Sequence, residues 1–168
     1  MTPSDLLTDA LGRVLEELEA VLDGLDEEAL TARPTPTANS IAWLVWHLTR
    51  VQDDHIAHVA GTEQVWTSEE YAERFGLPFP VEAHGYGHTS EEVGQVRGIP
   101  ASDLLDYYRE VHRASLAFLA TVTESGLDRV VDTRWDPPVT LGARLVSVVN
   151  DCTQHVGQAA YVRGLLGG

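Results

Sequence analysis

Hydrophobic residues recur at spacings of three and four positions in four separate stretches of this chain. In the first stretch, residues 4–25, leucine and valine occupy positions 7, 11, 14, 18, 21 and 25. This spacing places them on one face of a helix. A second helix is predicted from a cap at Asn39 or Ser40 to Gly61, because a side-chain oxygen favours a helix start and glycine favours a helix end.

The same spacing predicts two more helices in the C-terminal half of the chain. Ser102 is expected to cap the third, which runs to about Ser125. The fourth starts at Thr140 and continues to Gly164 and the terminal pair 167–168.

Residues 61–100, between the second and third helices, have a poor pattern and are rich in glycine, proline and histidine. We expect a short helix opened by Ser68 there and otherwise a long crossover. Because a 20-residue helix is roughly 30 Å long, about 40 residues can return along it. A shorter connection, residues 134–138, brings Trp135 to the end of the helices, where it is expected to act as a lid.

The predicted fold is therefore all-α: a four-helix bundle with a long crossover between helices 2 and 3, in the order up-down-down-up. The length of 168 residues predicts a single domain over residues 1–168.

Charge and composition exclude several classes of partner. The net charge is -15, and all 11 fixed positive charges are scattered arginines, so binding to nucleic acid or to an anionic membrane is not expected. The longest apolar runs, such as residues 41–46, are far shorter than the roughly 20 residues that span a bilayer. With Cys152 as its single cysteine and no basic, apolar leader at residues 2–4, the chain is expected to be cytoplasmic.

One set of polar residues falls on the predicted inner faces of two helices. Asp151 and His155 are four positions apart on the fourth helix, so their side chains lie one turn apart on the same face. His47 lies at a matching depth on the second helix, which is antiparallel to the fourth. Two imidazoles and a carboxylate suit a divalent transition metal and leave coordination positions open, as in catalytic sites.

The spacing leaves a second interpretation open. His47 and His155 can be core histidines with satisfied hydrogen bonds, and Asp151 can be a partly buried carboxylate paired with Arg144 or with His155 itself. A pair of the form Asp-x-x-x-His is common by chance, so only its combination with His47 favours a metal.

Three stretches resemble a known family: residues 43–48 (WLVWHL), 85–89 (GYGHT) and 150–158 (NDCTQHVGQ). They look like the DinB-like superfamily of metalloenzymes, which is distinct from the DNA polymerase of the same name. Within it, the chain is most similar to the actinobacterial branch that contains the mycothiol-dependent maleylpyruvate isomerase metal-binding domain and related thiol transferases. The resemblance covers nearly the whole chain and also implies a four-helix bundle.

The resemblance implies a metal triad of one histidine on the second helix and a pair four apart on the fourth. His47 and His155 match two of its positions, and Asp151 stands where many members have histidine and some have a carboxylate. An oxygen donor in place of an imidazole broadens the choice of divalent metal from zinc toward manganese, iron or nickel.

Other polar residues have weaker signals. Asp54 is seven residues after His47 and is either an extra ligand, a hydrogen-bond partner that orients an imidazole, or the partner of Arg50 in an ion pair. His88, like His84, lies in the crossover and either contacts substrate or is exposed to solvent. Cys152 lies on an apolar stripe, which favours a buried core residue over a nucleophile.

These features support three functions. The first is a transferase that uses a low-molecular-weight thiol, such as mycothiol, as co-substrate and joins it to a small electrophile. The second is metal-assisted hydrolysis at the same triad. The third is a non-catalytic metal-binding or stress-response bundle that could act as a homodimer.

Overall fold

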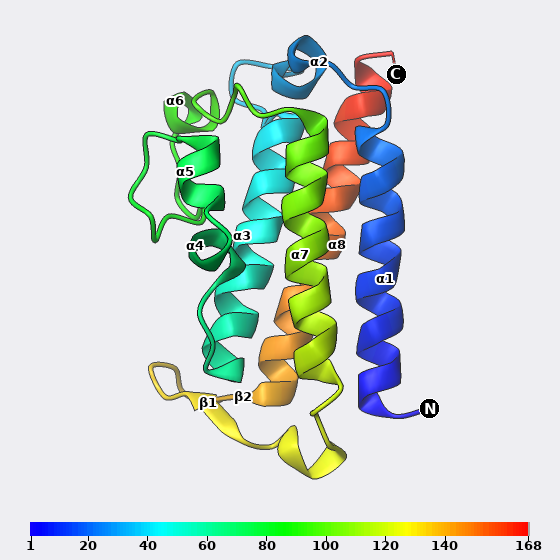
Figure 1. Ribbon diagram of the computed structural model, residues 1–168, viewed down its shortest axis with the longest axis vertical. Coiled ribbons are helices and arrows are strands. Elements are labelled where there is room, and N and C mark those ends of the chain that lie inside the picture. Colours follow the sequence, from blue (N-terminus) through cyan, green and yellow to red (C-terminus); the bar gives the residue numbers. More distant parts are fainter. Residues whose placement is uncertain (168) are drawn as a thin grey trace.

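The computed structural model describes residues 1–167 and is built around four long helices (Figure 1). These are α1 (Pro3–Leu22), α3 (Ile41–Ala60), α7 (Ala101–Leu119) and α8 (Leu141–Leu165). Helices α1 and α3 each pack against both α7 and α8. In the view of Figure 1, α1 and α8 run upward and α3 and α7 run downward. Gly168, the last residue of the predicted domain, lies outside the described residues.

Helix α3 begins and ends at the residues that its sequence predicts. The Ser40 side chain accepts a hydrogen bond from the backbone N–H of Trp43, and Gly61 ends the helix in the left-handed conformation, with φ 71°. Residues 40–50 are buried on every side of the helix, including polar side chains. A helix that is buried all round needs a cover on each face, and the crossover covers the face that α7 and α8 leave free.

The connections contain five short helical segments. They are α2 (Glu27–Thr31), α4 (Val65–Ser68), α5 (Tyr71–Phe75), α6 (Ser90–Val93) and a 3-10 turn, η1 (Glu124–Gly126). Figure 1 shows α4, α5 and α6 on the outer side of α3, where they form most of the crossover.

The prediction of a mainly helical protein is confirmed, but the all-α description is wrong in one place. Strands β1 (Val130–Asp132) and β2 (Val139–Thr140) form a small antiparallel hairpin before α8. The Asp132 carboxylate accepts hydrogen bonds from Arg134 and Arg144, each at 2.9 Å, and so joins the hairpin to α8. This connection is tertiary, and the local sequence contains no signal for it.

Two predicted helix boundaries are wrong. Helix α7 starts after Pro100, not at a Ser102 cap, and it ends at Leu119 instead of near Ser125. Beyond it, β-branched residues 121–123 disfavour helix, and the Thr123 side chain accepts a hydrogen bond from the N–H of Gly126 in the 3-10 turn.

No helix of the crossover starts at Ser68 within residues 61–100: α4 ends there, and α5 starts at Tyr71 after Glu70. The carboxylate of Asp53, which belongs to α3, accepts hydrogen bonds from the backbone N–H groups of Val65 (2.9 Å) and Trp66 (2.8 Å). The start of α4 is therefore determined by a residue twelve positions earlier in the chain.

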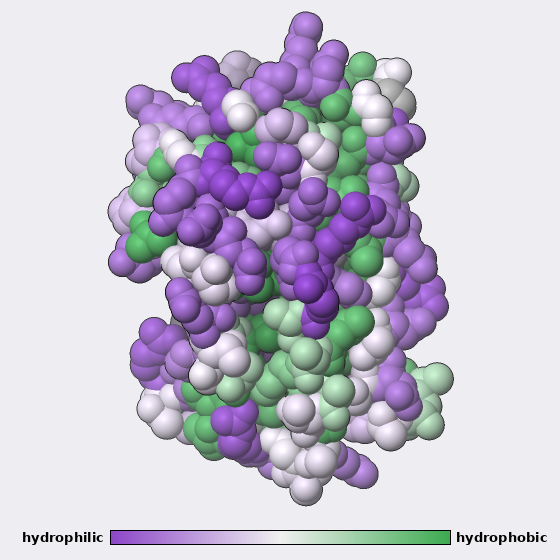
Figure 2. Space-filling model, in the orientation of Figure 1, coloured by the Kyte–Doolittle hydropathy of each residue, from purple (hydrophilic) through white to green (hydrophobic). Residues whose placement is uncertain are grey.

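The expected lid is also wrong, because Trp135 lies at the tip of the hairpin and is 66% exposed. Hydrophilic residues make up most of the face in Figure 2, and hydrophobic residues gather over the lower part of α7. Among residues 1–167, no helix has both the length and the hydropathy of a membrane span.

Candidate metal centre

The structure brings together the three side chains that the sequence marks as metal ligands. His47 projects from α3, and Asp151 and His155 project from α8, and each offers a donor atom within 4.8 Å of the other two. His47 is buried, and the other two side chains are partly buried. The rings of His47 and His155 are 4.6 Å apart between centroids and meet edge to face.

The orientation of His47 is fixed on two sides. Its Nδ1 donates a hydrogen bond to the backbone carbonyl of His84 in the crossover. Its ring stacks on the indole of Trp43, with 4.6 Å between centroids and 11° between planes. Because Nδ1 carries the proton in that hydrogen bond, the lone pair of the neutral imidazole lies on Nε2.

His155 has the same arrangement within α8. Its Nδ1 lies 2.8 Å from the carbonyl oxygen of Asp151, one turn earlier, and the carbonyl can only accept. The neutral ring therefore has its lone pair on Nε2 as well. Backbone carbonyls that hold Nδ1–H and leave Nε2 free are a common feature of histidine metal ligands.

The carboxylate of Asp151 provides the test of whether the residues fit a cation. Its Oδ2 is buried and accepts no well-formed hydrogen bond among residues 1–167, although it lies 3.4 Å from Nδ1 of His155, with which it forms an ion pair when that imidazole is protonated. A buried, unsatisfied carboxylate oxygen costs free energy unless a cation or donor meets it. Two oriented imidazoles and one unsatisfied carboxylate oxygen fit a divalent metal.

The two imidazoles have opposite pKa shifts. Burial lowers the pKa of His47 to about 4, and the nearby His155 adds to this, although the hydrogen bond to the His84 carbonyl opposes it. Burial also acts to lower the pKa of His155, but the interactions with the carboxylate and carbonyl of Asp151 outweigh it, so this pKa is raised.

We therefore expect the metal-free protein to titrate in two separated steps, His155 above pH 6.5 and His47 near pH 4. As pH falls from 6.5 toward 4, the unfolded chain binds a proton at position 47 that the folded protein excludes, so this residue makes folding less favourable. His155 acts oppositely: its contribution is present at low pH and is lost as pH rises through its raised pKa. Proton NMR of the two rings measures both midpoints, and the reverse order would contradict the geometry.

Gly85 is a site residue that the sequence reasoning did not identify as one. Its φ is +93°, a region that favours glycine, and a Cβ there would lie 2.7 Å from Nδ1 of His47. The same Cβ would lie 3.1 Å from atoms of the Trp43 and Trp46 rings. The crossover approaches His47 closely enough for the hydrogen bond to the His84 carbonyl only because residue 85 has no side chain.

Trp43 connects His88 to the triad, because its indole contacts both His88 and His47. The indole Nε1 of Trp43 donates to Nδ1 of His88 at 3.2 Å, and the His88 ring stacks on Trp46. The neutral imidazole of His88 therefore has its proton on Nε2. Contact with substrate remains a prediction for His88.

Asp54 is not brought to the triad. It accepts a hydrogen bond from Gln64 at 2.9 Å, and among residues 1–167 it has none from the triad imidazoles. The predicted ion pair with Arg50 is wrong, because the guanidinium lies 3.7 Å from the carboxylate of Asp53. Arg144 likewise binds Asp132, so among residues 1–167 the alternative pairing of Asp151 with Arg144 is wrong, whereas the alternative pairing of Asp151 with His155 is present at 3.4 Å.

Cys152 is fully buried between the helices, as its apolar stripe predicts. Its Sγ lies 3.4 Å from the side-chain oxygen of Gln52. Burial raises the pKa of this thiol well above its usual range, so it is not a nucleophile at neutral pH.

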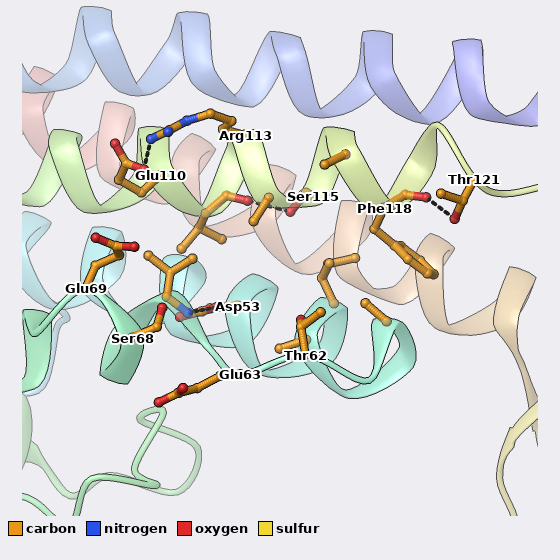
Figure 3. Close-up of a pocket in the computed structure, with 17 residues that line it drawn as sticks. Asp53, Thr62, Glu63, Ser68, Glu69, Glu110, Arg113, Ser115, Phe118 and Thr121 are labelled. Atoms are coloured by element: carbon orange, nitrogen blue, oxygen red, sulfur yellow. Dashed lines mark hydrogen bonds and ion pairs between the residues drawn. The ribbon is translucent and has the colours of Figure 1, made fainter.

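A cavity of about 650 Å³ lies between α3, α4 and α7, away from the triad (Figure 3). Its walls carry the apolar side chains of Ile56 and Phe118 together with the carboxylates of Glu63, Glu69 and Glu110. Carboxylates at the surface do not distinguish this cavity from the rest of an acidic protein, and none of the three triad residues lines it.

Fold and triad together define a helical protein with the donor set of a metal-binding DinB-like protein. A family model described as mycothiol-S-transferase matches residues 6–168, and the chain belongs to that family. The resemblance to the DinB-like superfamily is thereby confirmed. No curated protein matches the chain.

A solved structure is similar over almost its whole length. It is the crystal structure of a conserved protein from Enterococcus faecalis, which is 33% identical to this chain, with a TM-score of 0.92. The match covers 98% of this chain and 97% of the other.

Proposed function

We propose that this protein is a divalent-metal-dependent transferase that joins a mycothiol-type thiol to a small electrophile. The observation that carries the proposal is the unsatisfied Oδ2 of Asp151 beside two imidazoles whose Nε2 atoms are free. Membership of the mycothiol-S-transferase family supports the thiol as co-substrate. In this proposal the long helices form a four-helix bundle, and its α3 and α8 hold the ion.

Each residue of the centre has a separate task. His47, Asp151 and His155 would hold zinc, nickel, manganese or iron. When bound, such an ion supplies positive charge that lowers the pKa of a coordinated thiol, so that thiolate is present at neutral pH. Trp43 stacks on one face of the His47 ring and shields it from water. His88 would donate a hydrogen bond from its Nε2–H to a polar group of the substrate.

The transfer itself requires no redox partner. The thiol proton goes to solvent, the sulfur forms a bond with the electrophilic carbon, and the leaving group departs with the electrons of the bond that breaks. The residues of the centre contribute binding and orientation, and Cys152 takes no part because its thiol is buried and protonated.

The test begins with metal analysis of protein purified without a histidine tag, followed by substitution with cobalt. Adding mycothiol or bacillithiol is expected to produce a sulfur-to-cobalt charge-transfer band, because the thiol would bind directly to the ion. Asp151→Ala and His47→Ala should abolish the band. Absorbance titration measures the effect.

Cys152→Ala is the control, since it removes the protein's own thiol and leaves the triad intact. The band and thiol-dependent turnover should both persist in this variant. Loss of turnover in Cys152→Ala alone would contradict the proposal. If no thiol perturbs the cobalt spectrum and the triad instead supports ester or amide hydrolysis, the protein is a hydrolase; metal binding without turnover makes it a binding protein.

A further inference from the structure

The crossover segment 81–88 is held on α3 and α4 by side chains that donate to its backbone carbonyls. Arg50 donates to the carbonyls of Ala83 (3.1 Å) and Val81 (3.3 Å). Trp66 donates to the same Val81 carbonyl at 3.0 Å, and His47 donates to that of His84. Arg50, which anchors this segment of the crossover, therefore lies three residues after His47 on the same helix, α3.

Arg50 is unusual because its guanidinium is completely buried, at 0% exposure. Burial of an arginine is tolerated when its donors are paired, and the surrounding groups do pair them. The guanidinium donates to Oε1 of Gln64 at 2.7 Å and lies 3.7 Å from the carboxylate of Asp53. These contacts with Gln64 and Asp53 fix the orientation of the guanidinium that donates to the crossover carbonyls.

The contact with Ala83 restrains the group that holds His47. A peptide unit is planar, so fixing the Ala83 carbonyl also fixes the N–H of His84. The next peptide carries the His84 carbonyl and is followed by Gly85, whose φ of +93° few other residues adopt. Since His47 and Arg50 are three positions apart on one face of α3, both reach the same short stretch of backbone.

We infer that Arg50 is a positioning residue of the metal centre: through the Ala83 carbonyl it holds the His84 carbonyl against Nδ1 of His47, and so keeps Nε2 of His47 free for a cation. The tautomer is a property of the metal-free protein. The effect on metal affinity rests on the proposed function.

A matched control lies at the other end of the crossover. Arg33 also donates to the backbone there, to the carbonyl of Ser90 at 2.9 Å, and to the Ser90 hydroxyl at 2.8 Å. No hydrogen bond joins it to residues 81–88. If an arginine supported the centre only by holding the crossover in place, Arg33 would serve as well as Arg50.

The experiment compares Arg50→Lys with Arg33→Lys. Lysine keeps the charge opposite Asp53 but lacks the planar fork that reaches both carbonyls. In nitrogen-15-labelled, metal-free protein, Arg50→Lys should change the ring nitrogen shifts of His47 from the Nδ1–H form toward a mixture of tautomers. The Kd for zinc, measured by calorimetry, should rise about 10-fold or more, as for other groups that orient a ligand. Arg33→Lys should change neither.

The double variant Arg50→Met, Asp53→Asn leaves no unpaired buried charge and is expected to change the His47 shifts in the same direction. It is the variant to measure if Arg50→Lys lacks the helical circular dichroism of the wild type. The inference is overturned if a folded Arg50 variant keeps the wild-type His47 shifts, or if Arg33→Lys changes them equally. If the wild type binds no zinc while Arg50→Lys still shifts the tautomer, the proposed function fails and the positioning role stands.

Discussion

His155→Ala should remove metal binding while leaving the fold in place. The substitution deletes an imidazole whose Nδ1 is held by the Asp151 carbonyl, which leaves the lone pair on Nε2, and Asp151 and His47 alone leave a two-donor site. Removing a group that only orients a ligand already weakens metal affinity by about 10- to 100-fold, so loss of a ligand should exceed about 100-fold. Isothermal titration with zinc measures the difference.

His58→Ala is the control for this experiment, because His58 is an exposed histidine near the end of α3. At a zinc concentration of 100 times the wild-type Kd, wild type and His58→Ala should gain about 2.7 kcal/mol of unfolding free energy, and His155→Ala should gain less than about 0.4 kcal/mol. Equal stabilisation of all three proteins would place the zinc elsewhere and remove the basis of the proposed function.

The long helices could be predicted because their signals are local. Helix α3 has a serine cap and a terminal glycine within its own sequence, and both Ser40 and Gly61 act as expected. The hairpin and the start of α4 could not be predicted, because they depend on contacts between distant residues. Asp53 binds the first N–H groups of α4, and Asp132 binds Arg144 of α8.

The proximity of His47, Asp151 and His155 could be predicted because helical periodicity fixes which residues share a face, and the family resemblance indicated them as metal ligands. The same reasoning did not distinguish Asp53 from Asp54 as the partner of Arg50, and only the alternative pair with Asp54 was considered. Adjacent helical positions differ by about 100° in direction, and here Asp53 points inward to the guanidinium whereas Asp54 is partly exposed. Asp53 and Asp54 are three and four residues after Arg50, so helical spacing allows either to pair with it, and the buried one does.

The surroundings of His47 depend on how about 40 residues of crossover fold, for which the hydrophobic pattern contains almost no information. The GYGHT stretch was noted as part of a family resemblance, but the need for glycine at position 85 follows only from the approach of that backbone to a buried ring. Among residues outside the triad, substitution of Gly85 is therefore expected to have the largest effect on zinc affinity.

Gly85→Ala should destabilise the protein and weaken metal binding together. The backbone strain of alanine at φ +93° costs about 1–3 kcal/mol. In addition, the new Cβ would lie 2.7 Å from Nδ1 of His47 and 3.1 Å from the Trp43 and Trp46 rings, all of which are buried and cannot move aside freely. The crossover must retreat, and His47 then loses the carbonyl that orients it, so the Kd for zinc should rise about 10- to 100-fold.

Gly87→Ala is the control that separates the steric clash with His47 from the backbone strain of alanine at a positive φ. Gly87 has a similar φ of +78°, yet a Cβ there would meet no atom within 4 Å, so alanine introduces backbone strain without contact with the centre. Both variants should lose stability in chemical denaturation, and Gly85→Ala should lose more. Only Gly85→Ala should change zinc affinity and the ring nitrogen shifts of His47. Equal zinc affinities in the two variants would mean that the crossover carbonyl does not orient His47, and the interpretation of the crossover as part of the metal centre would be wrong.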